Sequence, residues 1–236
     1  LTSMGAINYS VTIVAADNLT ANAAATRLAL NSAINITASD AQTLADARIL
    51  NDATNSGTTT YAISDTAGNL ADALDLTVTL DDAVRASMVA AIENASGTVT
   101  VNNGGNANAN AAQATLLAGY TKAVVYDLVD TAAAMTASTV SAAALNEARN
   151  INASSGTTTA AQAATIMAAT NSGSTTIARV DGTAAEVLAL TLGANDTITA
   201  LNVTGPVSIN EAVAINAKDT GCLLYTSDAA DEEDSV

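Results

Sequence analysis

Aspartate residues recur where Ala-rich segments begin, and their carboxylates are the groups in this sequence best suited to chemistry. Carboxylate oxygens are ligands for Ca²⁺, so a row of them along one edge of a repeat protein would form a ladder of cation sites. The same oxygens can instead accept hydrogen bonds from the free N–H groups of a helix's first turn. We favour helix caps, because larger apolar residues follow at helical spacing. The residues are Asp17, Asp40, Asp65, Asp81, Asp130 and Asp181.

Two further groups of polar residues are weaker candidates. The segment Asn102-Asn103-Gly104-Gly105-Asn106 is rich in glycine, as calcium-binding turns are. The Gly-Gly-x-Gly-x-Asp nonapeptide of such turns is absent, however, so the segment predicts a loop. The carboxylates of Asp81 and Asp82 are adjacent at an expected helix start, which does not suit them to general acid–base catalysis.

The residues that most enzymes require are missing. The chain has no His and one Cys, so Ser-His-Asp catalysis and thiolate metal sites are excluded. Neither a Gly-x-Ser-x-Gly nucleophile turn nor a Gly-x-x-x-x-Gly-Lys phosphate loop occurs. The sequence therefore predicts no enzyme, no catalytic residue, no cofactor-binding residue and no metal site.

The charge balance limits the possible partners. The chain has 23 acidic and 7 basic residues, a net charge of -16, and the basic residues are scattered singly. Without a basic stripe to neutralise phosphates, nucleic-acid binding is not expected. An anionic membrane surface would repel the chain for the same reason, and no apolar stretch is long enough for membrane insertion.

The chain contains an internal repeat. The segment 34–74 recurs in degraded form at 151–190, and Ala-Thr-Asn-Ser-Gly at 53–57 reappears unchanged at 169–173. Repeats of this kind favour a tandem-repeat architecture. The composition fits, since 49% of the residues are apolar while Trp and Phe are absent. Small Ala side chains suit closely stacked layers better than one thick core.

Strands and helices are expected to alternate within the repeats. Helices are predicted after Asp40, Asp81 and Asn110, and helix ends at 55–57, 95–97 and 171–173, where Gly suits the left-handed position after a helix. One strand and one helix take roughly 20 to 28 residues, which gives about nine units. The predicted strands are 6–14, 34–38, 59–64, 76–80, 98–102, 123–129, 175–180 and 197–204.

The predicted fold is an α/β strand–helix tandem-repeat solenoid over residues 5–221, with a parallel sheet and Ala-rich helices on one face. A strand–helix unit of this length cannot bury its own apolar face, so units must stack. The alternative is a doubly wound α/β domain with helices on both faces. The side chains expected to point inward are Ile63, Val78, Val99, Val101, Val125, Ile177, Leu44, Leu70, Met88, Leu117, Ile166 and Leu188.

The last residues break the pattern. The Ala/Thr/Asn-rich sequence stops at Gly221, and the sequence from Cys222 onward resembles a translated transposon end and sequencing adapter. We therefore interpret 222–236 as a non-native tail, expected to pack against nothing; an acidic C-terminal tail is the alternative. The only Cys belongs to this tail, so disulfides are not expected. The chain is interpreted as a fragment of a longer protein.

The text of 53–74 and 160–190 resembles repeats of very large secreted or cell-surface proteins of marine bacteria, including cyanobacteria and repeats-in-toxin-like exoproteins. The resemblance implies an extracellular or cell-surface location and a structural or adhesive role without catalysis. Its implied partners are neighbouring repeats of the same chain and other cell-surface material. The alternative is a non-catalytic spacer, or a weak calcium-binding repeat region, attached to a secreted enzyme or toxin.

Overall fold

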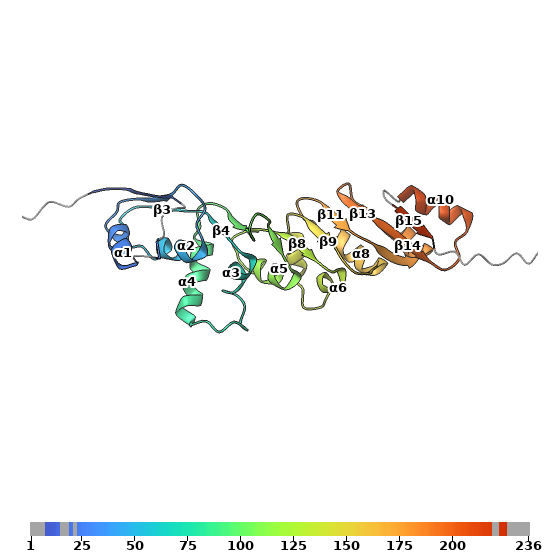
Figure 1. Ribbon diagram of the computed structural model, residues 1–236, viewed down its shortest axis with the longest axis horizontal. Coiled ribbons are helices and arrows are strands. Elements are labelled where there is room, and N and C mark those ends of the chain that lie inside the picture. The colour runs from blue at the N-terminus through green and yellow to red at the C-terminus, as the bar shows by residue number, and fades with distance from the viewer. Residues whose placement is uncertain (1–7, 15–18, 21–22, 219–221, 226–236) are drawn as a thin grey trace, which may run out of the picture. The chain divides into compact units, whose positions relative to one another are not determined.

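The computed structural model describes residues 8–14, 19–20, 23–218 and, for the backbone, 222–225 (Figure 1). The chain divides into two compact units, 1–126 and 127–236, which we describe separately. Both units are mixed α/β, and every strand pairing within them is parallel. The α/β class predicted from the sequence is therefore confirmed.

Unit 1 has two short-stranded sheets. In the first, β1 (Val11–Ile13), β2 (Ile36–Ala38) and β3 (Thr59–Thr60) pair in chain order. In the second, β4 (Ile63–Asp65), β5 (Val99–Val101) and β7 (Val124–Val125) do the same. The remaining strand is β6 (Asn108–Ala109). The helices are α1 (Ala23–Asn31), α2 (Leu44–Asn51), α3 (Ala67–Ala71), α4 (Asp82–Glu93) and α5 (Ala111–Leu117).

Unit 2 repeats one strand–strand–helix pattern three times. The strands β8 (Asp127–Asp130), β9 (Ile151–Ala153), β11 (Thr175–Ile177) and β13 (Asp196–Ile198) pair in chain order. A second sheet contains β10 (Thr158–Thr159), β12 (Val180–Thr183), β14 (Ala200–Thr204) and β15 (Cys222–Tyr225). The helices are α6 (Ala132–Met135), α7 (Ala142–Asn146), α8 (Ala160–Met167), α9 (Ala184–Ala189) and α10 (Ile209–Lys218).

The predicted runs of β-branched residues do not form one strand each. The runs 59–64, 123–129, 175–180 and 197–204 each divide into two strands that belong to different sheets. A repeat therefore contains two short strands and a helix, where one strand and one helix were expected. The strands β6, β9 and β10 were not predicted, because two or three residues of mixed type carry too little alternation.

The predicted strand at 76–80 is wrong. These residues form turns and a loop between α3 and α4, and Leu76 is 85% exposed. The alternation of Leu76, Val78 and Leu80 with Thr and Asp follows the pattern of a half-buried strand. Within the described structure no strand pairs with this segment. It is the connection that leads into α4.

The core is built from small and branched apolar side chains, as the composition suggests. Ala47, Ala91, Ala114, Ala144 and Ala163 on five helices are fully buried. Of the residues predicted to point inward, four are only partly buried, namely Val78, Val125, Met88 and Leu188. The others are buried as predicted: Ile63, Val99, Val101, Ile177, Leu44, Leu70, Leu117 and Ile166.

Tyrosines supply bulk that Phe and Trp would otherwise give to the core of unit 1. Tyr126 is fully buried, and Tyr61 and Tyr120 are nearly so. The Tyr61 hydroxyl donates to the carbonyl of Ala91 at 2.9 Å, and the Tyr120 hydroxyl to that of Leu70 at 2.7 Å. Burial raises the pKa of Tyr61 to about 12 and also raises the pKa of Tyr120. Both phenols therefore stay protonated and can remain hydrogen-bond donors.

Helix starts follow the predicted chemistry, but helix ends do not. Thr, Ser, Asp or Asn caps the described helices α2 to α9, with capping boxes at Asn110, Thr159 and Thr183. Helices α2, α4 and α8 end at Asn51, Glu93 and Met167, several residues before the predicted glycines. The glycines with positive φ are Gly104, Gly105, Gly156 and Gly205, so Gly57, Gly97 and Gly173 are not left-handed helix caps.

The expectation that the tail packs against nothing is wrong for the backbone of four residues. The backbone of Cys222–Tyr225 pairs in parallel with β14, with Leu201 opposite Leu223. The ladder is formed by backbone groups that any four residues can supply. The interpretation of 222–236 as a non-native tail stays a prediction. Residues 226–236 lie outside the described part of the chain.

Candidate functional site

The aspartates predicted to line one edge have separate roles in unit 1. Asp81 is the N-cap of α4 and accepts the N–H of Ala83 at 2.9 Å, as predicted. Asp65 is not a cap: its carboxylate accepts the N–H groups of Leu44 and Thr66, both at 2.8 Å, and Thr66 caps α3. Asp40 lies exposed before α2, whose cap is Thr43, and Asp17 lies outside the described residues.

The aspartates of unit 2 also depart from the prediction. Asp130 ends β8 and accepts the N–H of Thr131 at 2.7 Å, and Thr131 is the N-cap of α6. Asp181 lies within β12 and forms an ion pair with Arg179 at 2.5 Å, and the cap of α9 is Thr183. Three of the six aspartates, Asp65, Asp130 and Asp181, thus bind N–H or guanidinium groups without capping a helix themselves.

The Asn- and Gly-rich segment 102–106 is a loop, as predicted. The side-chain oxygen of Asn102 accepts the N–H of Gly105 at 2.8 Å, and that of Asn103 accepts the N–H of Ala67 at 3.0 Å. Asn106 accepts the N–H of Asn108 at 3.2 Å. Side-chain oxygens that could bind a cation are hence engaged by the loop's own backbone and by the start of α3.

The repeated Ala-Thr-Asn-Ser-Gly motif forms a polar network in unit 1. The side-chain oxygen of Asn35, in the preceding repeat, accepts the N–H of Thr58 at 3.0 Å and its hydroxyl at 3.1 Å. Asn55 of the motif donates to the carbonyl of Ile34 at 3.1 Å and accepts the hydroxyl of Thr59 at 2.9 Å. The motif thereby joins residues 55–58 to Ile34 and Asn35.

The second copy of the motif forms the same network in unit 2. Asn150 accepts the N–H of Ser174 at 3.0 Å and its hydroxyl at 3.2 Å. Asn171 donates to the carbonyl of Arg149 at 3.5 Å and accepts the hydroxyl of Thr175 at 3.1 Å. The two copies of the motif therefore share their five residues and also the hydrogen bonds that these residues form.

A second asparagine extends each network. Asn31 accepts the N–H of Thr54 at 2.9 Å, and Asn146 accepts the N–H of Thr170 at 3.0 Å. Asn31 is the last residue of α1 and Asn146 is the last residue of α7, and in each case one further helix, α2 or α8, lies between the asparagine and the motif. The motif is hence held at two points. Sequence reasoning missed these four acceptor asparagines, because they lie upstream of the recognisable motif.

The motif glycines are needed for close approach between repeats. A Cβ at Gly57 would lie 2.5 Å from the carbonyl oxygen of Ile34, and closer still to the side-chain oxygen of Asn35. A Cβ at Gly173 would lie 2.6 Å from the carbonyl oxygen of Arg149. Both distances are below van der Waals contact, so any other residue forces the two repeats apart.

Two carboxylates hold neighbouring turns by charge-assisted bonds. In unit 1, Glu93 accepts the N–H groups of Thr121 at 2.8 Å and Lys122 at 2.9 Å. Burial raises the pKa of Glu93, but the bonds from Thr121 and Lys122 outweigh it, so the pKa lies below its usual value. In unit 2, hydrogen bonds from the Arg149 guanidinium hold the pKa of Asp127 below its usual value. Both carboxylates are ionised at neutral pH and hold their hydrogen-bond donors in place.

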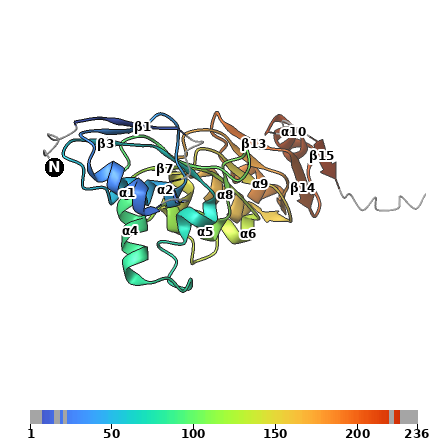
Figure 2. The same cartoon turned by 60° about the vertical axis from the view of Figure 1, so that its left-hand side comes forward.

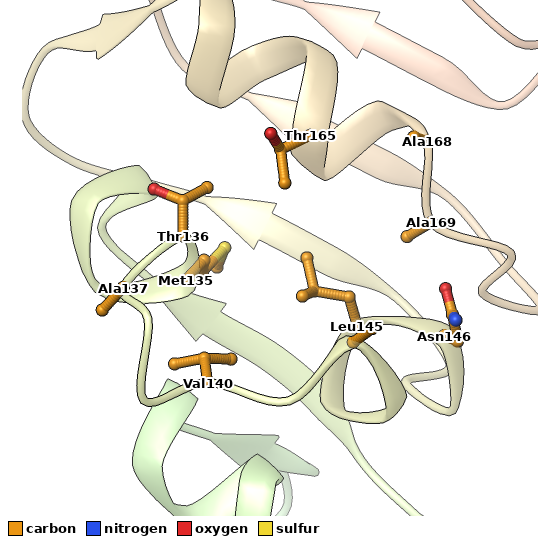
Figure 3. A pocket seen from close by; sticks show the side chains of 10 residues that line it. Met135, Thr136, Ala137, Val140, Leu145, Asn146, Thr165, Ala168 and Ala169 are labelled. Carbon is orange, nitrogen blue, oxygen red and sulfur yellow. The ribbon is translucent and has the colours of Figure 1, made fainter.

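A cavity of 320 Å³ lies between α6, α7 and α8 of unit 2 (Figure 3). Met135, Val140 and Leu145 supply most of its apolar lining. The hydroxyls of Thr136 and Thr165 donate to carbonyls of their own helices, at 2.8 and 3.1 Å. The lining therefore offers apolar surface but no pair of acid and base groups that could perform catalysis.

Metal and membrane features are likewise missing from what the structure describes. Within those residues, no three His, Cys, Asp or Glu side chains gather where they could hold a metal ion. No described helix is both long and apolar enough to cross a membrane.

Comparison with known proteins gives no family. No family model, curated protein or solved structure matches the chain. The function must therefore be argued from the arrangement of the residues themselves.

Proposed function

We propose that this chain is a non-catalytic structural repeat segment. The observation that carries the proposal is the network around Asn55 and Asn171, which has the same bonds in both copies. Catalytic and binding sites converge on a space that a ligand can enter. Here the repeated polar residues converge on the backbone of the neighbouring repeat. The polar residues that the two copies share thus form hydrogen bonds between neighbouring repeats.

A solenoid is part of the proposal. Its strands must pair in chain order at a nearly constant step, and the pairing in unit 2 supports this. Ile151 pairs with Thr175, and Thr175 pairs with Asp196, which are steps of 24 and 21 residues. A doubly wound domain would reorder its strands. In solenoids each repeat contacts only its neighbours, which suits a spacer or an extended surface.

An extracellular or cell-surface location, with a structural or adhesive role, completes the proposal. It is supported by the resemblance of residues 53–74 and 160–190 to repeats of large secreted bacterial proteins. The partners proposed are neighbouring repeats and other cell-surface material.

Deletion of one whole repeat tests the proposal. Removing residues 175–195 joins Ser174 to Asp196 and brings Asp196 to the register position of Thr175 opposite Ile151. A solenoid should close over the gap, because β13, β14 and α10 replace the deleted β11, β12 and α9. We expect urea unfolding to remain cooperative, with a lower midpoint.

A half-repeat deletion is the matched control. Removing residues 175–185 deletes both strands of the repeat but leaves most of α9. No strand then takes the position of β11 opposite β9. This variant should lose its circular dichroism signal and its cooperative transition. If the whole-repeat deletion were as damaging as the half-repeat deletion, the solenoid proposal would be refuted.

A further inference from the structure

One segment of unit 1 departs from the repeat spacing. Ile63 of β4 pairs with Val99 of β5, a step of 36 residues, whereas Val99 and Val124 of β7 are 25 apart. The additional chain forms the loop after α3 and most of α4, and we call residues 72–90 the excursion. In two views α4 and the loop before it extend away from the strands of unit 1 (Figures 1 and 2). Stacking of strands does not require this segment.

A single arginine organises the excursion. The Arg85 guanidinium donates to the carbonyl oxygens of Asp72, Ala73 and Asp75, each at 3.0 Å, and to that of Val78 at 2.9 Å. Four carbonyls directed at one charged group define the path of the loop. The loop is therefore preorganised, which lowers the entropic cost of binding a partner there.

The excursion carries an apolar hollow. Its volume is 620 Å³, and Leu74, Leu76, Ala86 and Val89 supply much of its lining. Leu76 is 85% exposed, the highest value among the large apolar side chains of the described residues. Exposed apolar surface with a polar rim is typical of interaction sites.

The excursion is acidic, and one of its carboxylates, Asp82, lines the hollow. Asp72, Asp75, Asp81 and Asp82 lie within the excursion, and Arg85 is its only basic residue. The Arg85 guanidinium is committed to backbone carbonyls. Hydrogen bonds from Thr77 hold the pKa of Asp75 below its usual value, so this carboxylate is charged at neutral pH. A partner must therefore combine apolar and basic groups.

We propose that the excursion is a docking site for a basic amphipathic helix of another protein. The hollow is lined by the side chains of α4 and of the loop, and no strand pairs there, so strand addition is not available. Recognition of a polyproline segment needs an aromatic-lined groove, and no aromatic side chain lines this hollow. The mode that fits lays the apolar face of a helix into the hollow. Basic residues on its flanks would meet Asp82 at the hollow and the further carboxylates of the excursion. This inference goes beyond a structural role and does not depend on it.

Peptide binding tests the inference with the full-length chain. The probe is a labelled peptide of ~18 Leu and Lys residues patterned as an amphipathic helix, with fluorescence anisotropy as the readout. Leu76→Lys should weaken binding about tenfold or more, because it removes apolar contact and adds a repelling charge. Leu28→Lys is the matched control, since Leu28 is 72% exposed on α1 of the same unit. It should change affinity less than about twofold.

Two further comparisons separate docking from simple charge attraction. A peptide with Ser in place of Leu should bind at least about tenfold more weakly. Asp82→Asn should weaken binding and reduce its salt dependence more than Glu147→Gln, an exposed carboxylate of unit 2. Equal loss of affinity in Leu76→Lys and Leu28→Lys would overturn the inference. So would equal binding of the Ser peptide, or no binding of the Leu/Lys peptide to the unchanged chain.

Discussion

Replacing Gly57 by Ala should separate two repeats of unit 1. The new Cβ would lie 2.5 Å from the carbonyl oxygen of Ile34 and still closer to the side-chain oxygen of Asn35. Asn35 must then turn away and give up two bonds, from the N–H and the hydroxyl of Thr58. Two lost hydrogen bonds and a local backbone shift together cost about 2 to 4 kcal/mol of unfolding free energy.

The second copy of the motif provides an internal replicate. Gly173→Ala meets the carbonyl oxygen of Arg149 at 2.6 Å and displaces Asn150 in the same manner. Its cost should equal that of Gly57→Ala to within about 1 kcal/mol. Gly68→Ala is the control, because its Cβ would have no neighbour closer than 3.9 Å. Within α3, this change should be neutral or stabilise by up to about 1 kcal/mol.

Urea unfolding followed by circular dichroism measures these differences. The account requires both motif variants to lose stability and the control to keep it. If Gly57→Ala and Gly173→Ala were no less stable than Gly68→Ala, the close approach between repeats would not exist as described.

Three further predictions concern single side chains. Arg85→Met should destabilise unit 1 by about 2 kcal/mol in urea unfolding, since four carbonyls lose a charged donor; an unchanged midpoint would contradict the role given to Arg85. The pKa of Asp127 is lowered by Arg149, so the bond's contribution to stability is present above the ordinary carboxyl pKa and lost as pH falls through the folded value. Asp127→Asn should therefore be less stable than the unchanged chain at neutral pH and equal to it in strong acid, and a difference independent of pH would refute this. Thr183→Ala should cost about 1 kcal/mol through loss of the α9 cap, measured by thermal unfolding against Thr183→Ser, which keeps the hydroxyl.

The sequence predicted the class of the fold and much of its core. β-branched runs at 98–102 and 175–180 gave real strands, and the helix after Asp81 begins where its cap was expected. These features depend on local alternation and capping, which a short window of sequence records. The division of a run into two strands depends on where the chain turns between sheets. Such a turn depends on the pairing of strands that are distant in sequence, which a single run does not show.

The roles of the polar residues were harder to predict. Asp65 and Asp130 precede helices, which predicts that they are caps, but the following Thr provides the cap in each case. An Asp cap and a Thr cap one residue later both place a suitable oxygen near the helix start. Only the backbone angles show which of the two residues is the cap. Gly57 was assigned to a helix end because the sequence shows glycine but not the neighbouring repeat that excludes a side chain.

Amide hydrogen exchange at Thr58 and Ser174, measured by NMR, tests the central claim most directly. Both N–H groups donate to an asparagine of the preceding repeat, Asn35 or Asn150. Both should therefore exchange slowly in the unchanged chain. Asn35→Ala should accelerate exchange at Thr58 and leave Ser174 protected, and Asn150→Ala should do the reverse. Rapid exchange of both amides in the unchanged chain would contradict the proposal that the motif fastens each repeat to the next.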